Sequence, residues 1–200
     1  MGPAPTLGPE RPFRWPPRWL GRANVLSQHA MGGLDGCWFG VTALALGLIV
    51  ACAGPGLQGQ VYRGGGYRFR VGPPAQDWRP IESSQSLVAF RDDRDRATVA
   101  LDGRCGQDGD DVPLTALTRH LFLYFTERKV LSERTFTLDG REALRTEMEA
   151  ELDGVPKRFT VVVLKKDGCV YDFIYVEDAP GSPAGRSEFD RFVAGFSTRD

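Results

Sequence analysis

Residues 130–177 read VLSERTFTLDGREALRTEMEAELDGVPKRFTVVVLKKDGCVYDFIYVE, and three Asp-Gly pairs divide this stretch at a spacing of 14 residues. The pairs are Asp139-Gly140, Asp153-Gly154 and Asp167-Gly168. Asp-Gly favours a two-residue type I′ hairpin turn, because both central residues of that turn need a positive φ. The spacing therefore predicts a four-stranded antiparallel meander with strands at about 130–138, 141–152, 155–166 and 169–177.

The second strand of this meander alternates two kinds of side chain. Charged residues at 145, 147, 149 and 151 alternate with Thr146, Met148, Ala150 and Leu152. A period of two is typical of a strand with one buried face. We therefore expect the charged side chains to face water and the others to face the core.

Two helices and three more strands are expected outside the meander. Short alternating or apolar runs predict strands at 67–71, 86–91 and 97–102. Helical spacing after Pro113, with Asp111 near the N-cap, predicts a helix whose buried face carries Leu114, Leu117, Leu121 and Tyr124 or Phe125. A last helix is expected to be capped by Ser187 and to bury Phe189, Phe192, Val193 and Phe196. This order (three strands, helix, four-stranded meander, C-terminal helix) predicts an α+β fold with helices packed on an antiparallel sheet.

Several of these motifs resemble the PsbP-like fold. They are the strand YRFRV (67–71) followed by Trp78, the turn LDGREAL (138–144), a Tyr-containing strand, and the terminal helix FDRFVAGF (189–196). The resemblance covers about residues 62–198, and several bacterial lipoproteins of unknown activity are similar. It implies a non-enzymatic accessory, assembly or binding protein, and it carries no catalytic residue over to this chain.

The first 51 residues are interpreted as a targeting region in two parts. Residues 1–30 hold six prolines and four arginines without apolar periodicity, which predicts a disordered extension. Residues 31–51 form a signal peptide, because the 14 uncharged residues 38–51 are too few for a membrane-spanning helix but suit a signal core. The run ends Ile49-Val50-Ala51-Cys52, which resembles the lipobox of bacterial lipoproteins. That resemblance implies lipidation of Cys52; a plain signal peptide that happens to end in Cys is the alternative.

A lipobox implies a lipid anchor in the membrane and a location in the bacterial envelope, facing the periplasm. Ala53 stands where an Asp would resemble an inner-membrane retention signal, which favours the outer membrane. The segment before the apolar run carries Asp35 and no cation after Arg22. Two translation starts therefore fit, Met1 with a long leading region or Met31.

The rest of the chain is expected to be a tether and one domain. Residues 52–66 include six glycines and are predicted to form a flexible tether, followed by a single domain at 67–200. Cys37 would leave with the signal and Cys52 would carry lipid, so Cys105 and Cys169 remain. An oxidising compartment favours a disulfide between them, and two buried free thiols are the alternative.

Composition and motifs limit the function. With Lys+Arg 25 against Asp+Glu 26, the formal net charge is −1, which argues against a nucleic-acid partner. The sequence has no nucleophile elbow, zinc motif or phosphate-binding loop, so no catalytic residue, metal or cofactor is assigned. The favoured function is a membrane-tethered, non-enzymatic interaction or assembly module with an envelope protein as partner. The alternative is a small-ligand binder or an unrecognised hydrolase with a cleft near His120.

Overall fold

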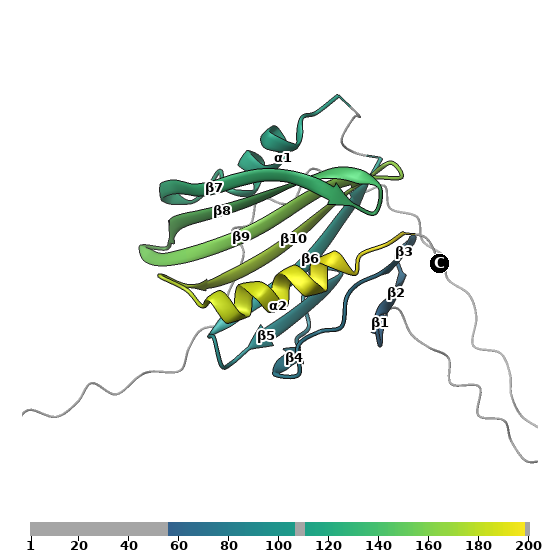
Figure 1. Cartoon of the computed structure of the whole chain (residues 1–200), viewed down its shortest axis with the longest axis horizontal. Helices are drawn as coiled ribbons and strands as arrows, with labels where there is room; N and C mark the ends of the chain where they lie inside the picture. The colour runs from purple at the N-terminus through teal and green to yellow at the C-terminus, as the bar shows by residue number, and fades with distance from the viewer. Residues whose placement is uncertain (1–55, 107–110, 199–200) are drawn as a thin grey trace, which may run out of the picture. The chain divides into compact units, whose positions relative to one another are not determined.

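The computed structural model describes residues 56–106 and 111–198, which form two antiparallel sheets and two helices (Figure 1). The small sheet has the order β1-β2-β3 and consists of β1 (Gly56–Gln58), β2 (Val61–Gly64) and β3 (Tyr67–Arg70). The large sheet has the order β4-β5-β6-β10-β9-β8-β7. Its strands are β4 (Trp78–Pro80), β5 (Val88–Asp92), β6 (Ala97–Cys105), β7 (Thr126–Leu138), β8 (Arg141–Leu152), β9 (Val155–Lys166) and β10 (Cys169–Asp178). The helices are α1 (Leu114–Leu121) and α2 (Pro183–Ala194), and the predicted α+β class is confirmed.

The four-stranded meander is present, with its turns at the three Asp-Gly pairs. At the first turn φ is 47° for Asp139 and 74° for Gly140, and the other two turns repeat these values closely. The strands pair directly across each turn, as in Leu138 opposite Arg141. β7 begins at Thr126, four residues earlier than predicted, and two register shifts interrupt its pairing with β8. Bulges of this kind break the period-two pattern from which a strand start is read.

The main core lies between the large sheet and α2, which crosses one face of that sheet in Figure 1. Phe192 packs edge-on against Trp78 and Phe90, with ring centroids 5.6 and 5.9 Å apart. Phe196 meets Phe173 of β10 and Phe69 of β3, so the small sheet joins the same core. The apolar face predicted for the last helix is therefore confirmed.

The opposite face of the large sheet is covered in part by α1. Phe122, which follows α1, and Phe125 both pack edge-on against Phe159 of β9, at 5.4 and 5.0 Å between ring centroids. Side chains an odd number of residues apart in a strand point to opposite faces of the sheet. Phe159 therefore packs on the α1 side of β9, and Val162 packs in the main core on the α2 side. Leu117 and Leu121 of α1 are buried as predicted, whereas Leu114 is only half-buried and the helix ends before Tyr124 and Phe125.

Coverage of both faces overturns the expected arrangement on β8. Arg145 is only 6 % exposed, because its side chain points towards α2 rather than to water. Thr146 and Met148 are buried on the α1 side. The side chains of β8 alternate as predicted, but the charged face lies beneath α2.

Residues 52–66 were predicted to form a flexible tether, but much of this Gly-rich stretch is folded. From Gly56 onwards it forms β1 and β2, and the domain therefore begins well before residue 67. Glycines lie where the backbone turns, with φ of 60° at Gly59 and 83° at Gly66, while Leu57 and Tyr62 pack inwards. β4 is likewise a strand that the sequence did not reveal.

Both helices begin elsewhere than expected. Pro113, not Asp111, occupies the N-cap of α1, which has no side-chain cap. Ser182, not Ser187, caps α2, and its Oγ accepts a hydrogen bond from the Gly185 N–H at 3.3 Å. Pro183 follows directly, and its fixed φ suits the first helical position.

The expected extension at 1–30, the signal peptide at 31–51 and Cys52 lie outside the described residues. Within 56–106 and 111–198, neither helix has the length and apolar character needed to cross a membrane.

Candidate functional site

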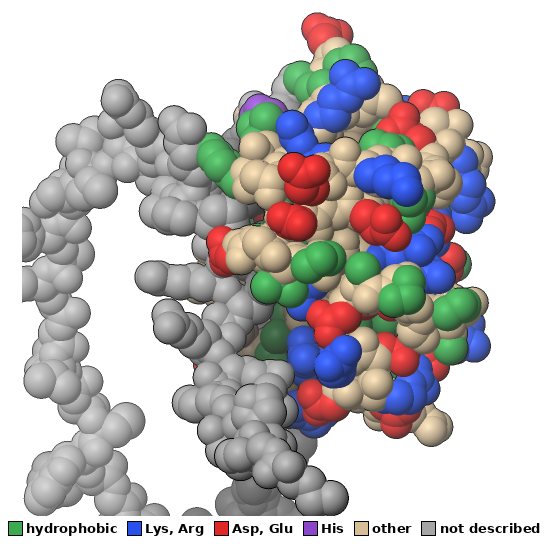
Figure 2. Space-filling model, turned by 90° about the vertical axis from the view of Figure 1, so that its left-hand side faces the viewer, with side chains coloured by type: hydrophobic (Ala, Val, Ile, Leu, Met, Phe, Trp, Pro, Cys, Tyr) green, Lys and Arg blue, Asp and Glu red, His purple; other side chains and the backbone are tan. Residues whose placement is uncertain are grey.

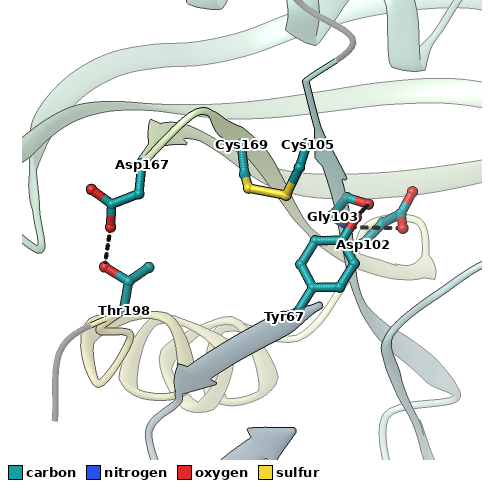
Figure 3. Close-up of a disulfide and its surroundings, with 7 residues drawn as sticks. All are labelled: Tyr67, Asp102, Gly103, Cys105, Asp167, Cys169 and Thr198. Atoms are coloured by element: carbon teal, nitrogen blue, oxygen red, sulfur yellow. Dashed lines mark hydrogen bonds between the residues drawn. A yellow bond between two sulfur atoms is a disulfide. The ribbon is translucent and has the colours of Figure 1, made fainter. Parts of the chain in front are cut away.

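The predicted disulfide between Cys105 and Cys169 is present (Figure 3). Cys105 ends β6 and Cys169 begins β10, and the two residues are direct register partners with Cα atoms 4.0 Å apart. The neighbouring Gly106 N–H donates to the Gly168 carbonyl at 3.0 Å. Closely approaching pairs of this kind alternate with hydrogen-bonded pairs along antiparallel strands. The bond therefore fastens two central strands at one end of the sheet.

The small sheet is joined to this end of the large sheet by Tyr67. Its hydroxyl donates a hydrogen bond to the Gly103 carbonyl at 2.7 Å, and the two residues face each other in Figure 3. A Cβ at Gly103 would lie 2.8 Å from the Tyr67 ring and 2.8 Å from Leu87. The position therefore admits only glycine without a local shift.

The C-terminal residues are attached to the turns of the meander. The Asp139 carboxylate accepts from the Thr198 N–H and hydroxyl at 3.0 and 3.1 Å, and the hydroxyl also lies 2.6 Å from Asp167. Lys166 pairs with the same carboxylate at 3.2 Å. Burial acts to raise the pKa of Asp139, but these hydrogen bonds and Lys166 outweigh it and lower the pKa.

A partly buried ionic cluster joins β8 and β9 to α2. Arg145 donates to Asp190 of α2 at 3.0 Å and to Glu147 at 2.6 Å, and Arg158 donates to Glu147 at 2.7 Å. Burial acts to raise the pKa of Glu147, but the two guanidinium groups outweigh it and hold the pKa at about 2. Because each of these carboxylates is paired with arginine, the cluster is best explained as a clamp that fixes the helix.

The start of α2 is packed against a buried phenol. A Cβ at Gly185 would lie 2.0 Å from the Tyr175 hydroxyl and 2.6 Å from Asp95. Neither that hydroxyl nor Asp92 Oδ2 has a hydrogen-bond partner in the described part of the chain. Burial, and then the charge of Glu177, raises the pKa of Tyr175. Tyr175 and Tyr171 are both buried and fill the core.

His120 is exposed at the end of α1. No described carboxylate is bonded to it, and the described His, Cys, Asp and Glu residues form no group of three that could hold a metal ion. The arrangement that a hydrolase would need at this histidine is therefore not assembled by the described residues.

An apolar groove of about 400 Å³ lies between the small sheet and the edge of the large sheet. Its walls come from the β1–β2 hairpin, β4 and β5, and include Leu57, Trp78, Ile81, Leu87 and Phe90. β4 pairs with residues 90–92 at the end of β5. The first residues of β5, Val88 and Ala89, lie beyond this pairing and line the groove. Ile81 is 40 % exposed, whereas Trp78 is 5 % exposed. A concave surface of this size with apolar walls suits an apolar side chain or a small ligand.

A second hollow, of about 580 Å³, lies between the first turn of α1 and the β7–β8 turn. Arg141, Glu142 and Lys165 line it, so charges of both signs meet there. Lys165 also donates to the Val112 carbonyl at 2.8 Å. Figure 2 shows a similar mixture of charges on the side that faces left in Figure 1, where Lys and Arg alternate with Asp and Glu. The first groove differs from this hollow in that no charged side chain lines it.

The sequence did not reveal this groove, because its position depends on β1, β2 and β4. One signal could have indicated the small sheet. Val61-Tyr62-Arg63 and Tyr67-Arg68-Phe69-Arg70 flank Gly64-Gly65-Gly66, and two apolar–basic runs around glycines are typical of a hairpin. The groove is the candidate functional site.

Comparison with known proteins supports the fold. No family model matches the chain, and no curated protein matches it. Cyanobacterial PsbP from Synechocystis sp. PCC 6803 is similar in structure, with TM-score 0.50 and 16 % identity over 76 % of this chain and 99 % of that one. LpqN of Mycobacterium tuberculosis, described as involved in cell envelope biogenesis, has TM-score 0.45 and 17 % identity over 67 % and 86 % of the two chains. The chain has a PsbP-like α+β fold.

A protein from Bacteroides thetaiotaomicron VPI-5482 is a further structural neighbour. Its TM-score is 0.47 at 12 % identity, over 66 % of this chain and 45 % of that chain. The present chain therefore spans less than half the length of that protein. At these identities the likeness concerns the fold, not the function.

Proposed function

We propose that this chain is a lipid-anchored protein of the bacterial envelope whose domain acts as a non-enzymatic interaction or assembly module. In this proposal Cys52 carries the lipid, residues 53–55 connect it to β1, and the apolar groove receives an envelope protein. The outer membrane is the favoured destination because Ala53 follows the cysteine.

The groove is the observation that carries this proposal. Its rim residue Ile81 and its wall residue Leu57 offer apolar surface at the edge of the sheet, where a partner can approach without unfolding the domain. The charged side chains nearest the helices are instead paired with one another, as at Glu147 and Glu177. A partner that inserts one apolar side chain into the groove would gain about 25 cal/mol of binding free energy for each Å² of apolar surface buried. A gain from one side chain is small enough for reversible assembly.

Site-specific photo-crosslinking in native envelopes tests the proposal. A photoreactive residue at Ile81 should give a discrete adduct, whereas the same residue at Val155, which is 50 % exposed at the β8–β9 turn, should not. Leu57→Asp, combined with the probe at Ile81, should abolish the adduct without unfolding the domain, because Leu57 is only partly buried. Equal adducts from both positions, or an Ile81 adduct that Leu57→Asp leaves unchanged, would refute docking in the groove.

A further inference from the structure

We infer that the apolar groove selects its occupant through Trp78. The occupant is an extended segment of the partner protein, which inserts an apolar side chain and offers a neutral carbonyl oxygen to the Trp78 indole N–H. This inference rests on the proposed function and adds the chemistry by which the groove recognises the partner.

Among the described residues that line the groove, Trp78 alone has a side chain with a polar atom. The others are aliphatic residues, two prolines, Phe90 and a glycine. Trp78 is 5 % exposed, and its Nε1 has no hydrogen-bond partner in the described part of the chain. Buried donors are nearly always paired, because an unpaired one forfeits the hydrogen bond that it makes with water in the unfolded chain. The indole N–H is therefore a donor that an occupant of the groove can satisfy.

The core residues packed on Trp78 offer the indole no acceptor. Phe90 and Phe192 lie against it, with ring centroids 5.8 and 5.6 Å from that of Trp78. Both neighbours are hydrocarbon rings, and Phe192 belongs to α2 within the main core. An acceptor can approach the indole from the groove, because Trp78 forms part of its wall.

Main-chain donors in the wall of the groove are largely used or missing. Pro74 and Pro80 have no N–H. The Ile81 N–H already donates to the Ala89 carbonyl at 3.0 Å. An occupant with one acceptor beside an apolar group therefore matches this surface better than one with several polar groups.

The acceptor is expected to be neutral. No charged side chain lines the groove, so a carboxylate or a phosphate would lose its hydration there without gaining a counter-ion. A main-chain carbonyl oxygen accepts a hydrogen bond without that cost.

The open rim of the groove favours a protein segment over a lipid chain. Ile81 is 40 % exposed and Leu57 is half-buried, whereas Trp78 and Phe90 are buried. A groove of about 400 Å³ with this shape can enclose one side chain at its inner end. An acyl chain laid across it would leave much of its apolar surface in water, which is unfavourable.

The edge of the sheet at the groove does not suit the addition of a strand. β4 is the outer strand of the large sheet beside β5 (Figure 1), and it is only three residues long. Pro80 lies in β4 and has no N–H to donate to the ladder that an added strand would need. The partner is therefore recognised by one side chain and one carbonyl rather than by a continuous ladder.

The test follows the indole N–H resonance of Trp78 by NMR in the isotope-labelled protein, held in phosphatidylcholine nanodiscs. Trp78 is the only tryptophan after Cys52, and Trp78→Phe assigns its resonance whether or not the leader has been removed. The probes are N-acetyl-leucine methylamide, which carries an apolar side chain between two carbonyls, and N-acetyl-glycine methylamide, which lacks that side chain. The leucine probe should move the indole resonance downfield and shift the amide resonance of Ile81, and the glycine probe should do neither.

Three variants separate the hydrogen bond from the shape of the groove. Trp78→benzothienylalanine replaces the indole N–H with sulfur and keeps the fused rings, so the leucine probe should bind about ten-fold more weakly. Leu57→Asp should abolish binding of the probe, because it places a charge in the apolar wall. Val155→Asp changes an exposed apolar residue at the β8–β9 turn instead and should leave binding unchanged.

The outcomes distinguish this inference from the proposed function. Shifts of the groove amides with an unmoved indole, or equal affinities of wild type and Trp78→benzothienylalanine, would overturn the role of Trp78 and leave docking in the groove intact. If the leucine probe shifts no groove resonance while the Ile81 photo-adduct still contains a protein, the inferred recognition chemistry is wrong. An Ile81 adduct that contains a lipid would overturn the protein occupant, and the absence of any adduct would refute the proposed function and this inference with it.

Discussion

Loss of the Cys105–Cys169 disulfide should lower the stability of this domain substantially. The bond closes a loop of 64 residues that contains α1 and all of β7, β8 and β9. In the chain-entropy account, a crosslink of this span stabilises the folded state by about 4 kcal/mol, mainly by restricting the unfolded chain. The entropy of unfolding of a domain this size converts that value to a fall in Tm of about 10–15 °C.

The assay is thermal unfolding followed by circular dichroism on the full chain. The double variant Cys105→Ser/Cys169→Ser should melt lower than the oxidised wild type, and a reductant should lower the wild type towards the variant while leaving the variant unchanged. The folded structure should survive, because the two strands remain hydrogen-bonded along β6 and β10. If oxidised wild type and double variant melt together, or if both cysteines of the oxidised chain react with a thiol reagent after denaturation, the disulfide account is wrong.

Three further predictions follow from the packing and the charges. Gly185→Ala should destabilise the domain by about 1–3 kcal/mol in chemical denaturation, because the new Cβ would lie 2.0 Å from the Tyr175 hydroxyl. The double variant Gly185→Ala/Tyr175→Phe should recover part of this loss, because it removes the hydroxyl. Equal losses of stability in the single and double variants would show that the clash is not the cause. Tyr175→Phe alone should be neutral or stabilising by the same measurement, because it removes a buried hydroxyl that has no described hydrogen-bond partner. Glu147 has a folded pKa of about 2 against an ordinary value of 4.5, so its stabilisation is present above pH 4.5 and is lost as pH falls towards 2. The free energy of unfolding of the wild type should fall by up to about 3 kcal/mol between pH 4.5 and pH 2, and that of Glu147→Gln should fall less. Identical dependence of stability on pH in the two proteins would show that Glu147 does not contribute.

The meander was predictable because its signals are local. Each Asp-Gly pair specifies a turn by its own backbone preference, and three turns at equal spacing specify four strands whatever surrounds them. The fold class follows from the same elements. The disulfide was predicted from the cysteine count, since Cys105 and Cys169 are the pair that remains after Cys37 and Cys52 in an exported chain. The pairing of β6 with β10 that brings the two cysteines together is a long-range contact, which no local pattern indicates.

The rest depends on contacts between distant segments. The sequence predicts that Arg145 and Glu147 face water, because no local pattern indicates that α2 covers this face of β8. The residue of α2 that contacts Arg145 lies 45 residues later in the chain. β4 is only three residues long and is a strand because β5 offers it an edge. The apolar groove inherits this dependence: Leu57 and Ile81 come together only through the packing of the small sheet against the large one.

The N-terminal residue of the mature protein decides whether the chain is anchored by lipid at Cys52. The protein would be extracted from native membranes with detergent, digested, and its N-terminal peptide analysed by mass spectrometry. We expect the mature chain to begin at Cys52 and this residue to carry a thioether-linked diacylglycerol. A mature chain that begins elsewhere, or an unmodified Cys52, would refute the lipid anchor.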